Sequence, residues 1–116
     1  MSAAEYVTLG WQRADFIARV DAQTAEFDAL LLPTVPIVAP DITAFEKDED
    51  YWRLNMRILR NTAIVNFLDR CAVSVPIHPP GTAPIGLMIV GRHGDDRRLL
   101  GMAMALEAAI ERDRRR

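Results

Sequence analysis

The chain has 116 residues, 50% hydrophobic and 26% charged, which predicts one globular domain at most and argues against disorder. Its 14 basic and 16 acidic side chains leave a net charge of −2, which gives no support for a nucleic-acid or membrane-surface partner. The single cysteine, Cys71, excludes an internal disulfide and a four-cysteine zinc site. No apolar run is long enough to cross a bilayer and no signal-peptide pattern is present, so we expect a cytoplasmic protein.

The N-terminal segment has the pattern of a helix. Ser2 and Glu5 have the spacing of a capping box, in which each side chain accepts a hydrogen bond from a free backbone N–H at the helix start. Apolar residues then recur with helical period, at Tyr6, Leu9, Phe16, Ile17, Val20 and Phe27.

Residues 28–34 contain an unbroken apolar run. Such a run is typical of a strand buried on both faces, as in parallel sheets. Pro33 and Pro36 then end regular structure, and we expect an extended loop to about Lys47.

A second helical segment begins in the acidic cluster of residues 46–50, since negative side chains stabilise a helix N-terminus. Its apolar spacing is given by Tyr51, Leu54, Ile58, Ala63, Val65 and Leu68. Residues 48–68 are enough for two helices, and we expect a kink near Asn61.

Two short apolar segments, residues 72–77 and 85–90, are separated by a Pro-Pro-Gly-Thr turn sequence and predict a β-hairpin. Asp95 or Asp96 should cap a last helix, whose seam consists of Leu99, Ala103, Leu106 and Ile110. The predicted class is therefore α/β, in the order helix, strand, helix, strand, strand, helix. So few elements have too little surface to bury both faces of the first strand and all the apolar sides of the last helix. We expect self-association or a piece of a larger fold.

The residues that could carry catalysis have unfavourable spacing. Cys71 and His78 fall on opposite faces of a strand, and Ser74 and His78 are about 13 Å apart along it, whereas a nucleophile and its base need about 3 Å. His93, Asp95 and Asp96 lack a recognisable metal-ligand spacing and fit a turn followed by a helix cap. No cofactor or metal is expected.

Three segments together resemble the C-terminal part of the amidase signature family of hydrolases. Residues 27–36 are similar to the family's strand with aspartate, hydrophobic residues and Pro-Thr-x-Pro. Residues 62–67 and 73–76 resemble its Thr-x-x-x-Asn and Ser-x-Pro stretch. Residues 84–91, with Asp95, Leu99 and Leu100, resemble its Pro-x-Gly segment and the start of its last helix. The resemblance covers nearly the whole chain and implies a fragment of the amidase-signature fold, with residues 1–116 as a single C-terminal segment.

The resemblance implies hydrolysis of amides by a Ser–cis-Ser–Lys triad around a Gly/Ser-rich signature in the N-terminal half of the family's enzymes. That signature is missing from this sequence, whose only serines are Ser2 and Ser74 and whose only lysine is Lys47. We therefore expect the chain to be inactive alone, as a truncated part of an amidase whose partner is a second copy or the missing N-terminal half. The alternatives are a non-enzymatic, dimeric binding or scaffold module, or one chain of a split amidase.

By the same resemblance, Thr62 and Asn66 share a helix face that lines the substrate pocket. A structural alternative for Asn66 is a hydrogen bond to the carbonyls at the helix end. The family often has an Asn-Leu-x-Gly-x-Pro link where this chain has residues 66–72, and Met88 stands where the family often has glutamine. Leu59 stands where amidotransferase members have an aspartate that helps hold glutamine, which favours a general amidase over a glutamine-using enzyme.

Overall fold

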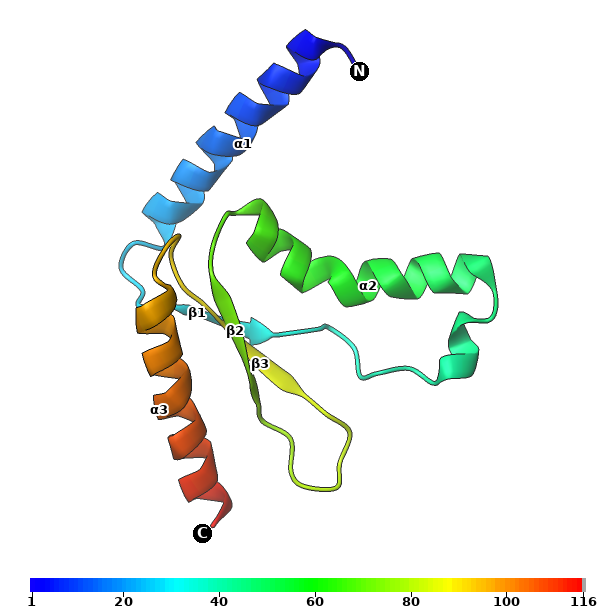
Figure 1. The fold of residues 1–116 in the computed structure, drawn as a ribbon, viewed down its shortest axis with the longest axis vertical. Coiled ribbons are helices and arrows are strands. Elements are labelled where there is room, and N and C mark those ends of the chain that lie inside the picture. Colours follow the sequence, from blue (N-terminus) through cyan, green and yellow to red (C-terminus); the bar gives the residue numbers. More distant parts are fainter. Residues whose placement is uncertain (116) are drawn as a thin grey trace.

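The computed structural model describes residues 1–115 and shows three long helices arranged around a small sheet (Figure 1). The predicted order of elements is confirmed, with a short 3-10 helix added in the loop that precedes the second helix. The elements are α1 (Ala3–Gln23), β1 (Leu30–Pro33), η1 (Ile42–Phe45), α2 (Asp48–Phe67), β2 (Ala72–Pro76), β3 (Gly86–Val90) and α3 (Asp96–Arg114).

The sheet has three antiparallel strands in the order β1-β3-β2. The predicted hairpin of β2 and β3 is confirmed, and it pairs Ser74 with Met88 and Val75 with Leu87. On the other edge of β3, Leu32 is paired with Met88. Residues of β1 and β2 that pair with the same residue of β3 therefore share a face of the sheet.

The expectation that β1 is buried on both faces, as in a parallel sheet, is wrong. The strand pairs antiparallel with β3, and its residues alternate between half-buried and exposed. Leu30 and Leu32 pack on the face covered by α2, whereas the side chain of Leu31 is 61% exposed. The reason is that α3 packs against β2 and leaves the same face of β1 bare.

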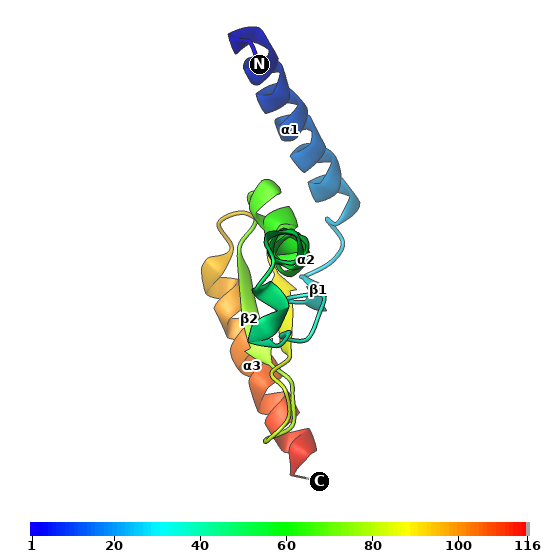
Figure 2. The same ribbon diagram turned by 90° about the vertical axis from the view of Figure 1, so that its right-hand side faces the viewer.

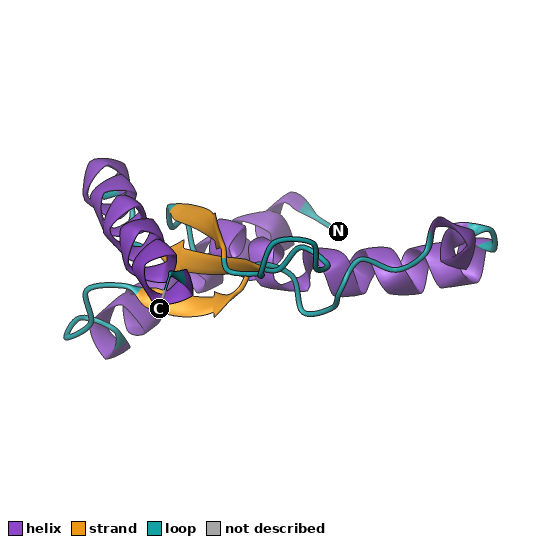
Figure 3. Ribbon diagram, turned by 90° about the horizontal axis from the view of Figure 1, so that it is seen from below, coloured by secondary structure: helices purple, strands orange, loops and turns teal. Residues whose placement is uncertain are grey.

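The core consists of two thin layers on opposite faces of the sheet, with α2 on one side and α3 on the other (Figure 3). One layer joins Val65 of α2 to Met88 and Val90. The other consists of Val75, Ile89, Leu99 and Ala103. The predicted seam of the last helix is confirmed, because Leu106 and Ile110 pack against this second layer.

The second helix is continuous from Asp48 to Phe67, so it is one helix and not two, and its ribbon bends at mid-length (Figure 1). Residues 48–67 contain neither proline nor glycine, so the bend occurs without the usual helix breakers. Asn61 is a buried contact: it is 8% exposed, and its Nδ2 donates to the carbonyl oxygen of Pro33 at 2.7 Å. This bond ties α2 to the end of β1.

The first helix projects from the rest of the molecule, as two perpendicular views show (Figures 1 and 2). Its capping box is confirmed, but none of its residues is buried, although its apolar stripe was predicted. Contacts with the remainder lie toward its C-terminal end. There Phe16 meets Phe67 at 5.9 Å between ring centroids, and Arg13 Nε donates to the Phe67 carbonyl at 2.9 Å.

Candidate functional site

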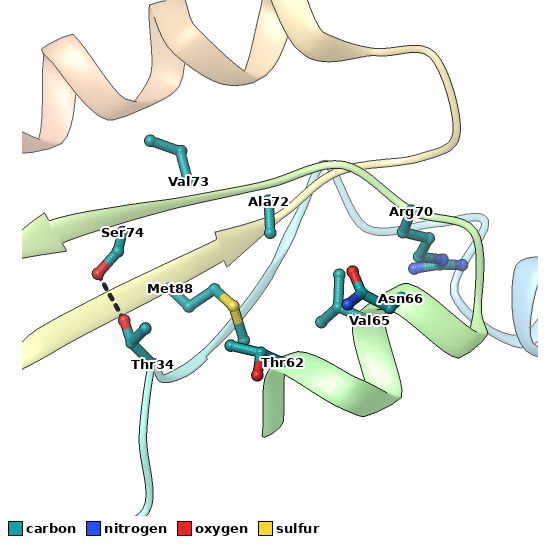
Figure 4. Close-up of a pocket in the computed structure, with 9 residues that line it drawn as sticks. All are labelled: Thr34, Thr62, Val65, Asn66, Arg70, Ala72, Val73, Ser74 and Met88. Carbon is teal, nitrogen blue, oxygen red and sulfur yellow. Dashed lines mark hydrogen bonds between the residues drawn. The ribbon is translucent and has the colours of Figure 1, made fainter. Parts of the chain in front are cut away.

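A pocket of about 270 Å³ opens on the α2 face of the sheet, between the C-terminal half of α2, the strands β2 and β3, and the chain that leaves β1 (Figure 4). Segments far apart in the sequence meet here because β3 lies between β1 and β2. The lining residues are Thr34, Thr62, Val65, Asn66, Arg70, Ala72, Val73, Ser74 and Met88.

Two hydroxyl groups meet at one end of the pocket. Thr34 Oγ1 and Ser74 Oγ are 2.5 Å apart and hydrogen-bonded. Both lie over Gly86, where an added Cβ would be 2.5 Å from Ser74 Oγ and 2.7 Å from Thr34 Oγ1. These three residues come from the three segments on which the resemblance to amidases depends. The segments thus converge on one structural unit, the bonded hydroxyls of Thr34 and Ser74, which we call the hydroxyl pair.

The floor of the pocket is apolar. Val65 and Met88 are buried, at 6% and 3% exposure, and Ala72 completes this surface from β2. Met88, which stands at a position where the family often has glutamine, therefore places a thioether where an amide would add a hydrogen-bonding group. The floor favours the apolar part of a ligand.

The predicted residues Thr62 and Asn66 both line the pocket, one turn apart on α2. The hydroxyl of Thr62 donates to the carbonyl of Leu59 at 3.1 Å. The side chain of Asn66 is exposed, so the structural alternative, in which it holds the helix end, is wrong.

Backbone groups close the end of α2 instead. The amide of Arg70 donates to the carbonyl of Val65, and that of Asp69 to Asn66, the pattern of a Schellman motif. Asp69 has a φ of 59°, the left-handed conformation that glycine adopts most easily. The Asn-Leu-x-Gly-x-Pro link of the family has glycine at this position, and here the aspartate accepts the strain.

Arg70 lies at the other end of the pocket and was missed by the sequence analysis. Its side chain is 3% exposed, and its Nη2 donates to Asp21 Oδ1 at 2.5 Å and to Thr24 Oγ1 at 2.6 Å. Its Nε is buried without a partner among residues 1–115. The available signal was an arginine directly before an apolar strand, a position where a charge needs partners from elsewhere in the fold.

The other residues considered for chemistry make structural contacts. Cys71 Sγ donates to the carbonyl of Arg92 at 3.0 Å, and the ring of His78 accepts from the amide of Ile85 at 3.2 Å across the hairpin loop. His93 Nδ1 lies 2.7 Å from the carbonyl of Asp69. Within residues 1–115 no group of three His, Cys, Asp or Glu side chains is placed to hold a metal ion.

The nucleophile and base types of the amidase triad are not brought together. Ser2 caps α1, Lys47 is the exposed N-cap residue of α2, and Ser74 bonds Thr34. Two carboxyl groups have shifted pKa values, and neither lines the pocket. The backbone N–H of Ser2 lowers the pKa of Glu5, and the backbone N–H of Thr43 lowers the pKa of Asp41. None of the helices in the described part of the chain is long and apolar enough to span a membrane.

Comparisons with known proteins identify the family of the chain. The family model described as Amidase matches residues 2–100. The chain is 34% identical to 2-amino-5-chloromuconic acid deaminase of Comamonas testosteroni over 95% of its own length and 24% of that protein. It is 35% identical to a glutamyl-tRNA(Gln) amidotransferase chain of Pseudothermotoga lettingae (72% of this chain, 17% of the relative). It is 30% identical to fatty acid amide hydrolase of Oryza sativa subsp. indica (77% and 15%).

The chain thus spans about a quarter or less of the length of each of these three relatives. No solved structure gives a significant match. The family match covers most of the chain, and its segments meet at the hydroxyl pair and the pocket beside it. The chain belongs to the amidase family.

Proposed function

We propose that this chain is the C-terminal part of an amidase-signature hydrolase that supplies walls of the substrate pocket but not the catalytic residues. The main support is that Thr34, Ser74 and Gly86 come together beside the pocket. The lining of this pocket includes no lysine, and its one serine is hydrogen-bonded to a threonine. The resemblance places the triad in the N-terminal half of the family's enzymes, which would then complete this pocket. Amide hydrolysis would belong to the completed protein.

The exposed surface supports the same proposal. The accessible surface is 8827 Å², whereas a compact monomer of 13.0 kDa exposes about 6,300 Å². Large apolar side chains contribute to the excess, such as Tyr6 and Trp11 on α1 and Met104 on α3, at 68%, 72% and 71% exposure. Exposed apolar area of this kind marks a surface that another polypeptide covers.

Complementation tests the proposal. The purified chain is mixed with the polypeptide encoded directly upstream of it, and release of ammonia from simple amides is measured. We expect hydrolysis in the mixture and none from either polypeptide alone. An upstream polypeptide with the Gly/Ser-rich signature that stays inactive in a stable complex with this chain would contradict it.

Variants of the pocket make this assay specific. Thr62→Val and Asn66→Ala should lower kcat/KM of the mixture, because both residues line the pocket. Asn55→Ala is the matched control, since Asn55 lies on the same helix and outside the pocket lining. Equal losses in all three variants would show that the pocket has no special role.

The second candidate is a non-enzymatic module that covers its apolar faces by self-association. It is favoured by the bare outer side of α3 and by Leu31 at the sheet edge, both of which a second copy could cover. A split amidase differs from this module in requiring a separate chain with the signature. A stable homodimer that does not bind the upstream polypeptide would favour the module.

A further inference from the structure

We propose that α1 is an interface between two copies of this chain, in which the two α1 helices lie antiparallel about a two-fold axis at Gln12. The spacing of residues along α1 suits this contact. The positions that would meet a second helix lie three and four residues apart in alternation, which is the heptad repeat of paired helices. They are Tyr6, Leu9, Arg13, Phe16 and Val20, of which Arg13 alone is polar.

Side chains on one flank of this stripe match each other across the axis. Glu5, Gln12 and Arg19 are seven residues apart and therefore share one heptad position. In an antiparallel pair, the same flanks of the two helices face each other. A two-fold axis at Gln12 then places Glu5 of each copy opposite Arg19 of the other, so this flank carries two ion pairs and no like-charge contact.

Both charged groups can take this additional partner. An ionised carboxylate has about four acceptor sites, and the Ser2 amide bonds Glu5 through Oε2 at 2.6 Å. Arg19 Nη2 lies 3.3 Å from Asp15 Oδ2 on the same helix, but the arginine side chain is 66% exposed and has further donors. The other flank of the stripe is uncharged at the same spacing, where it carries Ala3, Gly10 and Ile17.

The first half of α1 lacks support within one copy. None of the residues of α1 is buried, and its contacts with the remainder of residues 1–115 lie toward its C-terminal end (Figure 1). Helices in proteins are stabilised mainly by packing of their apolar face. Two grooves of about 630 and 650 Å³ follow the unsupported half, and both are lined by Leu9 and Gln12. The second α1 would occupy these grooves.

The symmetry of the charges indicates that the occupant is a second copy. Opposite charges placed evenly about the neutral Gln12 match the same helix in reverse, which a partner of another sequence does not require. The exposed surface is sufficient, because the chain exposes about 2,500 Å² more than a compact monomer of its mass. Each partner of a stable complex buries about 800 Å². Tyr6, Leu9 and Phe16 on the stripe are 68%, 53% and 43% exposed.

A charge reversal tests the pairing. Arg19→Glu turns both ion pairs into like-charge contacts, so the Kd of the dimer in sedimentation equilibrium should rise at least about tenfold. Arg112→Glu, the same charge change at an exposed position near the end of α3, should leave this Kd unchanged. A mixture of Arg19→Glu with Glu5→Arg should associate again, because each flank contact of the mixed dimer joins a carboxylate to a guanidinium.

Cross-linking locates the axis. In a Cys71→Ser background, Gln12→Cys should give a covalent dimer with a short bismaleimide, whereas Ala18→Cys, on the side of α1 away from the stripe, should not. A monomeric parent chain, a dimer of Arg19→Glu as tight as that of the parent, or cross-linking through Ala18→Cys in place of Gln12→Cys would overturn the proposal. A dimer disrupted only by Leu100→Glu with Met104→Glu would place the interface on α3 and would also overturn it.

Discussion

At Gly86 the close approach of two hydroxyls leaves no room for a side chain. An alanine Cβ would lie 2.5 Å from Ser74 Oγ, which is itself held by Thr34. Gly86→Ala should therefore lower the free energy of unfolding by about 1–3 kcal/mol, the usual cost of overpacking. Urea denaturation measures this loss.

The control for this prediction is Gly101→Ala. Gly101 lies within α3 and has no atom within 4 Å of the added Cβ, so alanine should raise stability by about 0.5–1 kcal/mol through helix propensity. A urea midpoint of Gly86→Ala at or above that of the parent chain would contradict this prediction, because it would mean that the two hydroxyls move apart without loss of stability.

The two asparagines of α2 should differ in their effect on stability. Asn61→Ala removes the donor to the Pro33 carbonyl in a buried setting, and should cost about 1–3 kcal/mol. Asn66→Ala changes an exposed side chain and should leave the unfolding midpoint within error of the parent chain. The reverse order of midpoints would contradict the contacts of these two side chains.

At the residue scale, the sequence identified the segments that contribute to the pocket but did not predict that they come together in the fold. Thr34, Ser74 and Gly86 each lie in a segment that resembles amidases, yet only the strand order β1-β3-β2 places them together. Arg70 could not be assigned, because its partners Asp21 and Thr24 are more than 40 positions away. Local periodicity carries no information about such pairs.

At the scale of elements, the stability of the first turn of α1 should depend on pH. The pKa of Glu5 lies below its ordinary value of 4.5 because the backbone N–H of Ser2, and then the side chain of Ser2, bond its carboxylate. A lowered folded-state pKa means that this stabilisation is present above pH 4.5 and is lost as the pH falls through the folded-state pKa.

NMR titration of the Glu5 carboxyl tests this prediction, with Ser2→Ala as the variant. The serine side chain accepts from the Glu5 amide at 3.3 Å, so its loss should fray the first turn and move the pKa of Glu5 toward 4.5. Glu26→Gln, which changes a carboxyl outside the capping box, should leave it unchanged. A Glu5 pKa that is the same with and without the serine side chain would show that the box does not form.

Elements defined by local signals were predictable, and those defined by distant pairing were not. The capping box, the hairpin and the seam of α3 each follow from residues within a few turns of one another. The environment of β1 does not, because it depends on the antiparallel pairing with β3 and on the packing of α3 over β2 and β3, which leaves β1 uncovered on that face. Residues 48–68 have length for two helices, and only the absence of a breaker indicates one.

At the scale of the whole molecule, the chain is extended. Its radius of gyration is 17.6 Å, against about 13 Å for a compact domain of this length. The protruding α1 and the N-terminal half of α2 account for this shape (Figure 1). A sequence with ordinary globular composition therefore folds here with part of its apolar surface uncovered.

This surface predicts self-association of the isolated chain. Light scattering at increasing protein concentration should report a dimer or a larger species, because Leu31 and the outer side of α3 remain bare in a single copy. Leu100→Glu with Met104→Glu, on the exposed side of α3, should shift the equilibrium toward monomer. A parent chain that stays monomeric throughout would count against an interface on these faces.

We infer that this amidase-family chain carries walls of a pocket without the residues that cleave an amide. Amide hydrolysis by the purified chain alone, measured beside its Ser74→Ala variant, decides whether this is so. We expect no ammonia release above buffer from either protein, since Ser74 bonds Thr34 and Lys47 lies at the start of α2 outside the pocket. Turnover by the parent chain that disappears in Ser74→Ala would show that the chain has a nucleophile of its own and would refute the inference.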